Sequence, residues 1–255
     1  MGTVYETDQP AAAVYEALVD LLPDVQALLV RSYKNPPPYE ERVTNRTSPD
    51  DILLQARKLR SAKGLPFWDA IVLEVIAEGS IEDWLLEGLL FHQEPIGKPL
   101  EISRGEVQAD GIVTAVAKAQ VPYPWALLSE VVCADGMQTH FPMLDFRCEI
   151  SPSNLKSVEA IARRLLSCPW AVIESERSYH LVGAELLTFR ELAAFFGRAL
   201  LLGPIVDRHY IAHQLLNGSA ALRIVAAPNK VGLRVRRTTF PHMGNFESIR
   251  PQAGG

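Results

Sequence analysis

Cysteine is scarce in this chain, and its few copies are not spaced for a metal site or a disulfide framework. The sequence has three cysteines, Cys133, Cys148 and Cys168. The number is odd and no C-x-x-C pair occurs, which argues against a set of disulfide bonds and against a cysteine-rich zinc site. We therefore expect a reducing, cytoplasmic compartment.

Long apolar runs are also missing. No stretch is long enough to span a bilayer, and the N-terminus shows no signal-peptide pattern. With 48% hydrophobic and 22% charged residues, the composition is that of a globular protein. At 255 residues the chain can bury one large core or two modest ones, and we expect no membrane partner.

The chain has no net positive charge, so it has no global attraction for nucleic acid. Its formal net charge is −5, and binding to phosphates must use a local basic patch. Residues 208–246 contain no Asp or Glu. The cations of this stretch are Arg208, Arg223, Lys230, Arg234, Arg236 and Arg237. Arg234 and Arg236 alternate along an expected strand, which favours a basic face that contacts phosphates; the alternative is a solvated face.

The first half of the chain has helical periodicity. Apolar residues recur at helical spacing, and Pro23 should kink or split the first segment. The expected helices cover 11–33, 51–64, 67–77 and 81–92. Residues 94–122 are mixed in pattern. We interpret 1–122 as a helical module with a mixed connection, and its apolar stripes as core rather than as a ligand site.

The second half of the chain predicts an α+β fold. Short β-type runs alternate with capped helices and turn signals. Expected strands cover 128–133, 139–148, 170–175, 179–186, 221–226 and 232–240, with helices after Ser151, Thr188 and Asp207. The resulting β-α-β-β-α order indicates a largely antiparallel sheet with helices on one face. We expect this core to span 123–246, followed by a disordered tail at 247–255.

Three short clusters carry candidate chemistry. On a strand, Asp145 and Glu149 would share a face and could bind a divalent cation, but Arg147 lies between them and would compete with it. The alternative is a surface ion pair at a strand end. The second cluster, 175–180, places hydroxyls, a guanidinium and an imidazole at one turn. Phosphate binding requires such donors. The alternative is a hairpin tip with solvated polar residues. In the third, Asp207 follows two apolar residues and suits a helix N-cap.

Taken in order, these clusters resemble the motifs of the archaeo-eukaryotic primase superfamily, the primase-polymerase or PrimPol-like group. That family has a D-x-D on a strand, a Ser-to-His turn and strand, and a later Asp after an apolar residue. The corresponding segments are 143–147, 175–180 and 205–207, and the resemblance covers roughly 125–240. In having a single Asp in the first motif, the chain is similar to the primase 1D-like subgroup. That subgroup is connected with bacterial mobile-element and phage-conflict loci.

The resemblance implies an RRM-like core and a set of site residues. It implies catalytic roles for Asp145, Asp207 and His180, with Asp145 and Asp207 as ligands of Mg²⁺ or Mn²⁺ if the protein is active. Glu149 could substitute for a missing carboxylate ligand, but its displacement of about 6.6 Å along the strand is large against a metal–metal spacing of about 4 Å. It implies nucleotide or phosphate contacts from Ser175, Arg177, Ser178, His180, Arg223 and Lys230. The basic strand would bind nucleic acid through Arg234, Arg236 and Arg237.

The chain departs from this family pattern at Arg147, which stands where the second carboxylate of D-x-D would be. Two-metal catalysis needs that carboxylate, so the first hypothesis is a degenerate primase-like protein that binds nucleotide or nucleic-acid phosphates with weak or no synthesis. A second hypothesis is a non-enzymatic scaffold whose helical half docks a protein partner. A third is an active nucleotidyltransferase.

Overall fold

The computed structural model describes residues 3–33, 51–65, 67–79, 83–92, 96–119, 124–224 and 233–243. The chain divides into two compact units, one formed by 1–34 together with 95–255 and the other by 35–94. The expected boundary near residue 122 is therefore not where the structure divides. The predicted tail at 247–255 lies outside the described residues.

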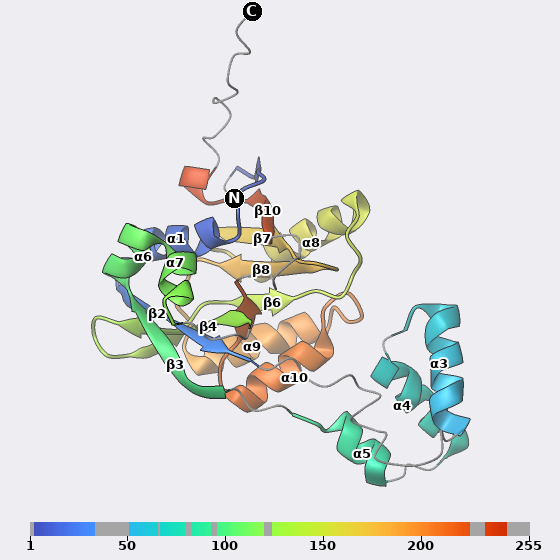
Figure 1. Ribbon diagram of the computed structural model, residues 1–255. Helices are drawn as coiled ribbons and strands as arrows, with labels where there is room; N and C mark the ends of the chain where they lie inside the picture. Colours follow the sequence, from blue (N-terminus) through green and yellow to red (C-terminus); the bar gives the residue numbers. More distant parts are fainter. Residues whose placement is uncertain are drawn as a thin grey trace, which may run out of the picture. The chain divides into compact units, whose positions relative to one another are not determined.

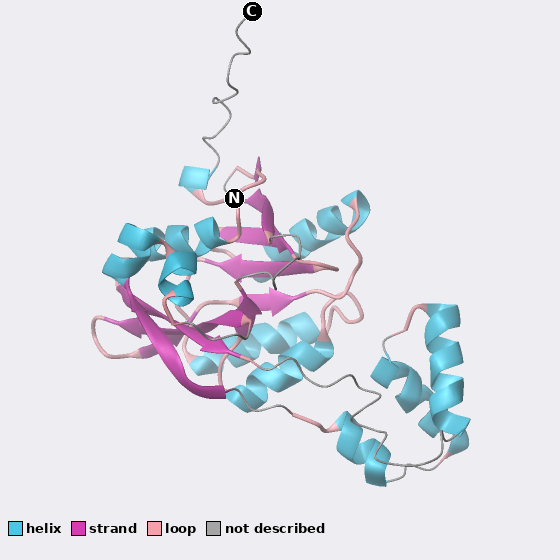
Figure 2. Cartoon of the chain, in the orientation of Figure 1, coloured by secondary structure: helices cyan, strands magenta, loops and turns pink. Residues whose placement is uncertain are grey.

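The larger unit has two antiparallel sheets (Figures 1 and 2). Its elements begin with β1 (Tyr5–Glu6), α1 (Ala12–Leu21), β2 (Val25–Ser32), β3 (Ile96–Ser103), α6 (Arg104–Asp110), α7 (Ile112–Ala117), β4 (Trp125–Cys133) and β5 (Gln138–His140). They continue with β6 (Met143–Asp145), α8 (Pro152–Leu165), β7 (Trp170–Glu174), β8 (Tyr179–Gly183), α9 (Phe189–Leu200), α10 (Arg208–Asn217), β9 (Ala221–Arg223), β10 (Arg234–Thr238) and a 3₁₀ turn (Pro241–Met243).

The first sheet has the strand order β1-β10-β7-β8-β6, and the second has the order β3-β2-β4-β5 with β9 also paired to β4. Every described pairing is antiparallel. The predicted α+β class and the β-α-β-β-α order, here β6-α8-β7-β8-α9, are confirmed. Strand β8 is buried at all five positions, so the motif strands lie deep in the core.

The second half of the expected helix over 11–33 is wrong, because Val25–Ser32 forms strand β2. Helix α1 ends at Leu21, just before Pro23. Strand β2 lies between β3 and β4 and has an apolar, largely buried sequence, which a short run cannot distinguish from a helix by periodicity alone. Strand β3 escaped prediction because Gly97 and Pro99 are poor strand residues; as an edge strand it tolerates them.

The predicted strand over 139–148 is also wrong as one element. It breaks at Phe141 and Pro142, so that β5 joins one sheet and β6 the other. Both residues at the break are buried, and the Pro142 carbonyl accepts a hydrogen bond from Gly183. Passing from one sheet to the other in two residues places Asp145 at the end of β6, on the edge of the first sheet.

The smaller unit has its own apolar core. It contains α3 (Asp51–Lys63), α4 (Phe67–Glu78) and α5 (Asp83–Leu89). The buried side chains that pack together are Ile52, Leu53, Ala56, Phe67, Ala70, Ile71, Val75 and Leu85. The helical reading of this part is therefore confirmed for the residues that the structure describes. None of the described helices is long and apolar enough to cross a bilayer.

The N-cap of α9 gives a test of the local sequence signals. Thr188 Oγ1 accepts a hydrogen bond from the Glu191 amide, and the Glu191 carboxylate accepts one from the Thr188 amide. We expect Thr188→Ala to lower the free energy of unfolding by about 1 kcal/mol. Thr114→Ala, at an exposed position inside α7, should change it little. Urea denaturation of both variants checks this, and equal losses would contradict the capping role.

Candidate functional site

The first two motifs meet across one pair of strands. In the pairing of β6 with β8, Asp145 lies directly opposite His180. Side chains at directly opposed positions of an antiparallel pair project from the same face. Asp145 Oδ1 lies 3.6 Å from His180 Nε2. The structure therefore places these two side chains next to each other, as the motif order predicts.

The third motif joins the first through backbone hydrogen bonds. The Asp207 amide donates to the Asp145 carbonyl at 3.0 Å, and the Arg147 amide donates to the Ile205 carbonyl at 2.7 Å. Phe146 and Val206 form an isolated antiparallel bridge between them. The segments 145–147 and 205–207 thus run side by side, and all three motifs converge on the end of β6.

The Asp207 carboxylate has the capping role expected of it. Its Oδ1 accepts hydrogen bonds from the amides of His209 at 2.9 Å and Tyr210 at 3.1 Å, at the start of α10. These bonds hold the carboxylate at the helix N-terminus, where the helix dipole favours a negative charge. The cap and the motif assignment are compatible. Both amides bond to Oδ1, so Oδ2 is left for a further ligand.

The charges at the centre of the site are unusual. Burial, together with the nearby Asp207 carboxylate, raises the pKa of Asp145 to about 8, although the Arg223 guanidinium opposes the shift. Burial and then Arg223 lower the pKa of His180 to about 4. Near neutral pH the contact therefore joins a protonated carboxyl to a neutral imidazole, and it is not an ion pair. Among the described residues, buried Nδ1 of His180 has no hydrogen-bond partner.

Arg147 lies beside the third-motif carboxylate. Its Nη1 is 3.8 Å from Asp207 Oδ1 and 3.3 Å from His209 Nδ1. A guanidinium at this distance competes with a metal ion for the same oxygen. The described part of the chain contains no group of three or more His, Cys, Asp or Glu side chains arranged to hold a metal ion. Beside Asp207, a guanidinium thus occupies the place where a further carboxylate ligand would be expected.

Glu149 is not on the strand that carries Asp145. Strand β6 ends at Asp145, and Glu149 is an exposed residue whose carbonyl accepts a hydrogen bond from Asn154 Nδ2 at 2.8 Å. The shared strand face expected for 145, 147 and 149 is wrong, because the chain leaves the sheet to bond with 205–207 and to enter α8. Its proposed place as a further metal ligand has no support from this geometry.

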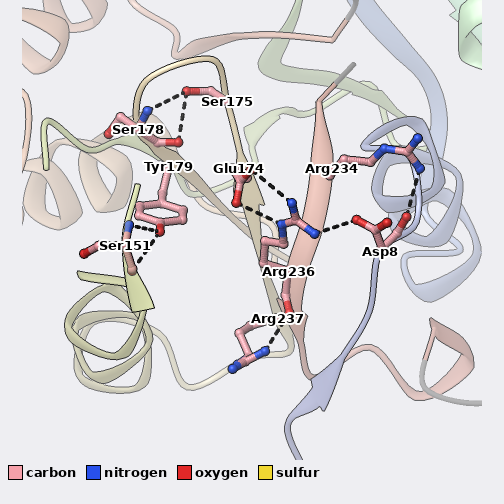
Figure 3. A network of polar contacts seen from close by, with 9 residues as sticks. All are labelled: Asp8, Ser151, Glu174, Ser175, Ser178, Tyr179, Arg234, Arg236 and Arg237. Carbon is pink, nitrogen blue, oxygen red and sulfur yellow. Dashed lines mark hydrogen bonds and ion pairs between the residues drawn. The ribbon is translucent and has the colours of Figure 1, made fainter. Parts of the chain in front are cut away.

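The two serines of the second motif fasten the turn between β7 and β8. Ser175 Oγ donates to the Ser178 carbonyl at 3.1 Å and accepts from the Ser178 amide (Figure 3). Ser178 Oγ donates to the Phe146 carbonyl in a short hydrogen bond, which ties the turn to the first motif. Both hydroxyl protons are committed to the backbone. Arg177 at the tip is exposed.

Arg223 reaches the site from the other sheet. It lies on β9, and its Nη1 donates to Glu176 Oε1 on the turn at 2.8 Å. Its charge lowers the pKa of both Asp145 and His180, so the guanidinium lies close to the central pair. Glu176 is the residue that sequence reasoning missed. The sequence held a signal for this pairing. The basic stretch 208–246 has no acid of its own, so its arginines must find carboxylates elsewhere, and Glu176 lies in the motif turn.

Arg236 on the expected basic strand is occupied by acidic partners. It forms a two-pronged ion pair with Glu174, with Nε and Nη2 at 2.9 and 3.0 Å from the carboxylate oxygens, and its Nη1 lies 2.6 Å from Asp8 Oδ1 (Figure 3). Arg234 donates to the Asp8 carbonyl at 3.0 Å. These contacts bind β10 to β7 and to the chain after β1.

Arg237 has acidic partners as well, Glu6 at 2.5 Å and Glu159 at 3.4 Å. A bulge between Val235 and Arg237 disturbs the alternation on which the expected basic face depended. Three cations of the acid-free stretch, Arg223, Arg236 and Arg237, are thus paired with carboxylates from distant segments. Nucleic-acid contact by the basic strand stays a prediction without support from these contacts, and Lys230 lies outside the described residues.

Comparison with known proteins adds one finding. A family model described as archaeo-eukaryotic primase 1D-like matches residues 105–233, about half of the chain. No curated protein and no solved structure matches the chain. The matched range holds Asp145, His180 and Asp207, the residues that the fold brings to one place. The chain therefore belongs to the archaeo-eukaryotic primase 1D-like family.

Proposed function

We propose that the motif site binds the phosphate groups of a nucleotide or a nucleic-acid end, with weak or no polymerase activity. The observation that carries this proposal is the guanidinium of Arg147, 3.8 Å from Asp207 Oδ1, at the position where the family pattern has a carboxylate. It puts a fixed positive charge beside the carboxylate that a metal ion would otherwise neutralise.

The rest of the site supports an anionic ligand. Arg223 is 37% exposed and lies close to the Asp145 and His180 pair, so it can meet a phosphate in a charge-assisted hydrogen bond. With its pKa raised, Asp145 is largely neutral near pH 7 and adds little repulsion. The neutral His180 imidazole carries one N–H donor. Phosphate binding would therefore proceed through guanidiniums and the imidazole, with the serines holding the turn.

We extend the proposal to the biological setting. The likeness to the primase 1D-like subgroup favours a part in bacterial phage defence or in a mobile element, where a primase-like domain recognises nucleotides or nucleic-acid ends. This extension depends on the family alone. Its test is whether loss of the gene, or the variants described below, changes phage plating on a host that carries the system.

An active nucleotidyltransferase is the second candidate, and it rests on the two aspartates. The Asp207 amide bonds to the Asp145 carbonyl at 3.0 Å, so the two carboxylates start from neighbouring backbone positions. If a divalent ion binds, Asp145 and Asp207 would hold it, and the ion would supply charge neutralisation to a triphosphate. Template-dependent incorporation that disappears in Asp145→Ala would establish this candidate over the first.

A scaffold function is the third candidate, and it rests on the unit formed by 35–94. On α4, Val72, Leu73 and Ile76 are 38%, 47% and 70% exposed. Apolar side chains that are exposed at neighbouring helical positions are common at protein interfaces. Removing 35–94 would abolish partner capture under this candidate and leave nucleotide binding at the motif site unchanged.

Arg223 and Glu176 give a test with two opposite outcomes. We expect Arg223→Ala to weaken binding of a labelled nucleoside triphosphate about tenfold, since one charge-assisted hydrogen bond is lost. Glu176→Gln removes the competing carboxylate at 2.8 Å and should leave binding equal or tighter. Arg190→Ala, at an exposed position on α9, is the matched control. If both site variants weaken binding alike, Arg223 has only a structural role in holding the turn.

Arg147→Asp tests the degenerate site. It removes the competing cation and restores the D-x-D pattern of the family, so we expect the Kd for Mn²⁺ to fall by about tenfold or more. Arg147→Ala removes the cation without adding a ligand and separates the two effects. Titration followed by electron paramagnetic resonance of free Mn²⁺ measures both. Equal Mn²⁺ affinity in the wild type and in Arg147→Asp would contradict the proposal that Arg147 weakens metal binding at this site.

Asp145 also gives the protein a characteristic dependence of stability on pH. Because its pKa is raised to about 8, the folded state holds a proton there that the unfolded chain releases near pH 4, and stability falls as pH rises between these values. His180 acts oppositely below about pH 6.5, since its folded pKa is lowered to about 4. The window from about 6.5 to 8 thus isolates Asp145.

In that window we expect the free energy of unfolding of metal-free protein to fall by roughly 1 kcal/mol, after allowance for the partial exposure of the carboxyl. The variant Asp145→Asn should flatten this decline in stability. The control Asp24→Asn, at an exposed position, should leave the decline unchanged. Urea denaturation at pH 6.5, 7.25 and 8 measures it. A decline that persists unchanged in Asp145→Asn would show that another group is responsible.

A further inference from the structure

A cavity lies at the other end of β7 from the motif turn. Its volume is about 590 Å³, and it forms where α8 ends and β7 begins, with Thr239 beyond β10 on one side. Trp170, the first residue of β7, lines it, whereas His180 pairs with Ile173 further along the strand. Three residue steps along a strand separate the two places by about 10 Å. None of the motif residues lines the cavity.

Three arginines line this cavity, and two of them lack a counter-charge. Arg163 forms an ion pair with Glu159 Oε1 at 2.5 Å. Arg164 and Arg198 are exposed, and within the described residues neither guanidinium has an ion pair or hydrogen-bond partner. By contrast, Arg223 and the arginines of β10 all have acidic or carbonyl partners. In a protein of net charge −5, two unpaired guanidiniums at one hollow form a local attraction for anions.

The negative charges near the cavity are weaker than the positive charges of the two guanidiniums. The C-terminal end of α8 carries about half a negative charge, less than either guanidinium. Glu185 contacts the thiol of Cys168, and it does not line the cavity. Burial, and then Glu185, raise the pKa of Cys168 to about 12, so this lining residue is a neutral thiol. The cavity lining therefore includes guanidiniums and no carboxylate, and the Glu159 carboxylate is paired with Arg163.

The remaining wall is apolar. Leu165, Leu166, Pro169 and Val4 line it beside Trp170, and Ser167 is an exposed hydroxyl on the rim. A hollow of a few hundred cubic ångströms with an apolar wall and a few polar groups is typical of a small-ligand site. A guanidinium offers two parallel N–H groups to one phosphate. The combination fits a ligand with a phosphate at one end and a flat apolar body at the other.

We propose that this cavity is an accessory nucleotide site, in which Arg164 and Arg198 bind the phosphate and the apolar wall holds the base. It is independent of the motif site, since none of its lining residues belongs to a motif. The nucleotide has two sources, a free nucleoside phosphate or one residue of a single strand. Both present the same chemistry to the two arginines.

Equilibrium dialysis with labelled ATP in the presence of a chelator tests the proposal on the full-length protein. We expect Arg164→Ala/Arg198→Ala to remove one bound ATP per chain, or to weaken that class of site about tenfold for each lost contact. Arg57→Ala/Arg190→Ala removes the same charge from exposed helix positions that do not line the cavity. It should retain wild-type binding. Arg198→Glu, a single change, should abolish the site more strongly than the double variant.

The failure of this proposal and that of the motif site give different results. Loss of ATP only in Arg223→Ala, with the cavity double variant unchanged, overturns the cavity and supports the motif site. Loss only in the cavity variant does the reverse. Equal losses in the cavity variant and in its charge-matched control overturn the cavity proposal, because they reflect net charge alone.

A second arm distinguishes the two sources of the nucleotide. Labelled oligothymidylate is titrated into the wild type and into Arg164→Ala/Arg198→Ala. A loss of oligonucleotide affinity of tenfold or more in the double variant assigns the cavity to a strand, whereas loss of ATP binding alone assigns it to a free nucleotide. Wild-type binding of both probes by the double variant overturns the proposal.

Discussion

The backbone hydrogen bond from the Asp207 amide to the Asp145 carbonyl is the contact on which the site depends. It joins two segments that lie far apart in the sequence, and the β6–β8 register then sets His180 opposite Asp145. Because these contacts use the backbone, they persist whatever side chains stand at the motif positions. A scaffold of this kind holds Arg147 beside Asp207 while the backbone arrangement around them stays in place.

The same scaffold explains the charges at the site. Burial disfavours the charged form of each group, with Asp207 adding to the shift at Asp145 and Arg223 to that at His180, so the Asp145 carboxyl takes up a proton and His180 stays neutral. Arg147 and Arg223 supply the positive charge, and each has a carboxylate within 4 Å. Phosphate binding would compete with those internal pairs. Its affinity is therefore set by how weakly Glu176 and Asp207 hold the two guanidiniums.

Basic residues that look alike in the sequence have different surroundings in the fold. Arg236 and Arg237 are neutralised by Glu174, Asp8, Glu6 and Glu159. Arg164, which attracted no notice in the sequence, lines a cavity and has no such partner among the described residues. An arginine whose charge is already satisfied contributes packing and register more than ligand affinity. Among the described residues, unpaired positive charge thus also lies outside the stretch with the most basic composition.

Local signals in the sequence determined much of this protein. The caps at Ser151, Thr188 and Asp207, the apolar motif strands and the order of the three motifs depend on neighbouring residues, and they pointed to the α+β core and to its family. Tertiary structure alone decided which apolar run became β2, where 139–148 crosses between sheets, and which carboxylates neutralise each arginine. The reason is physical: strand pairing and ion pairing join residues that are distant along the chain, and neither leaves a periodic pattern in the sequence that forms it.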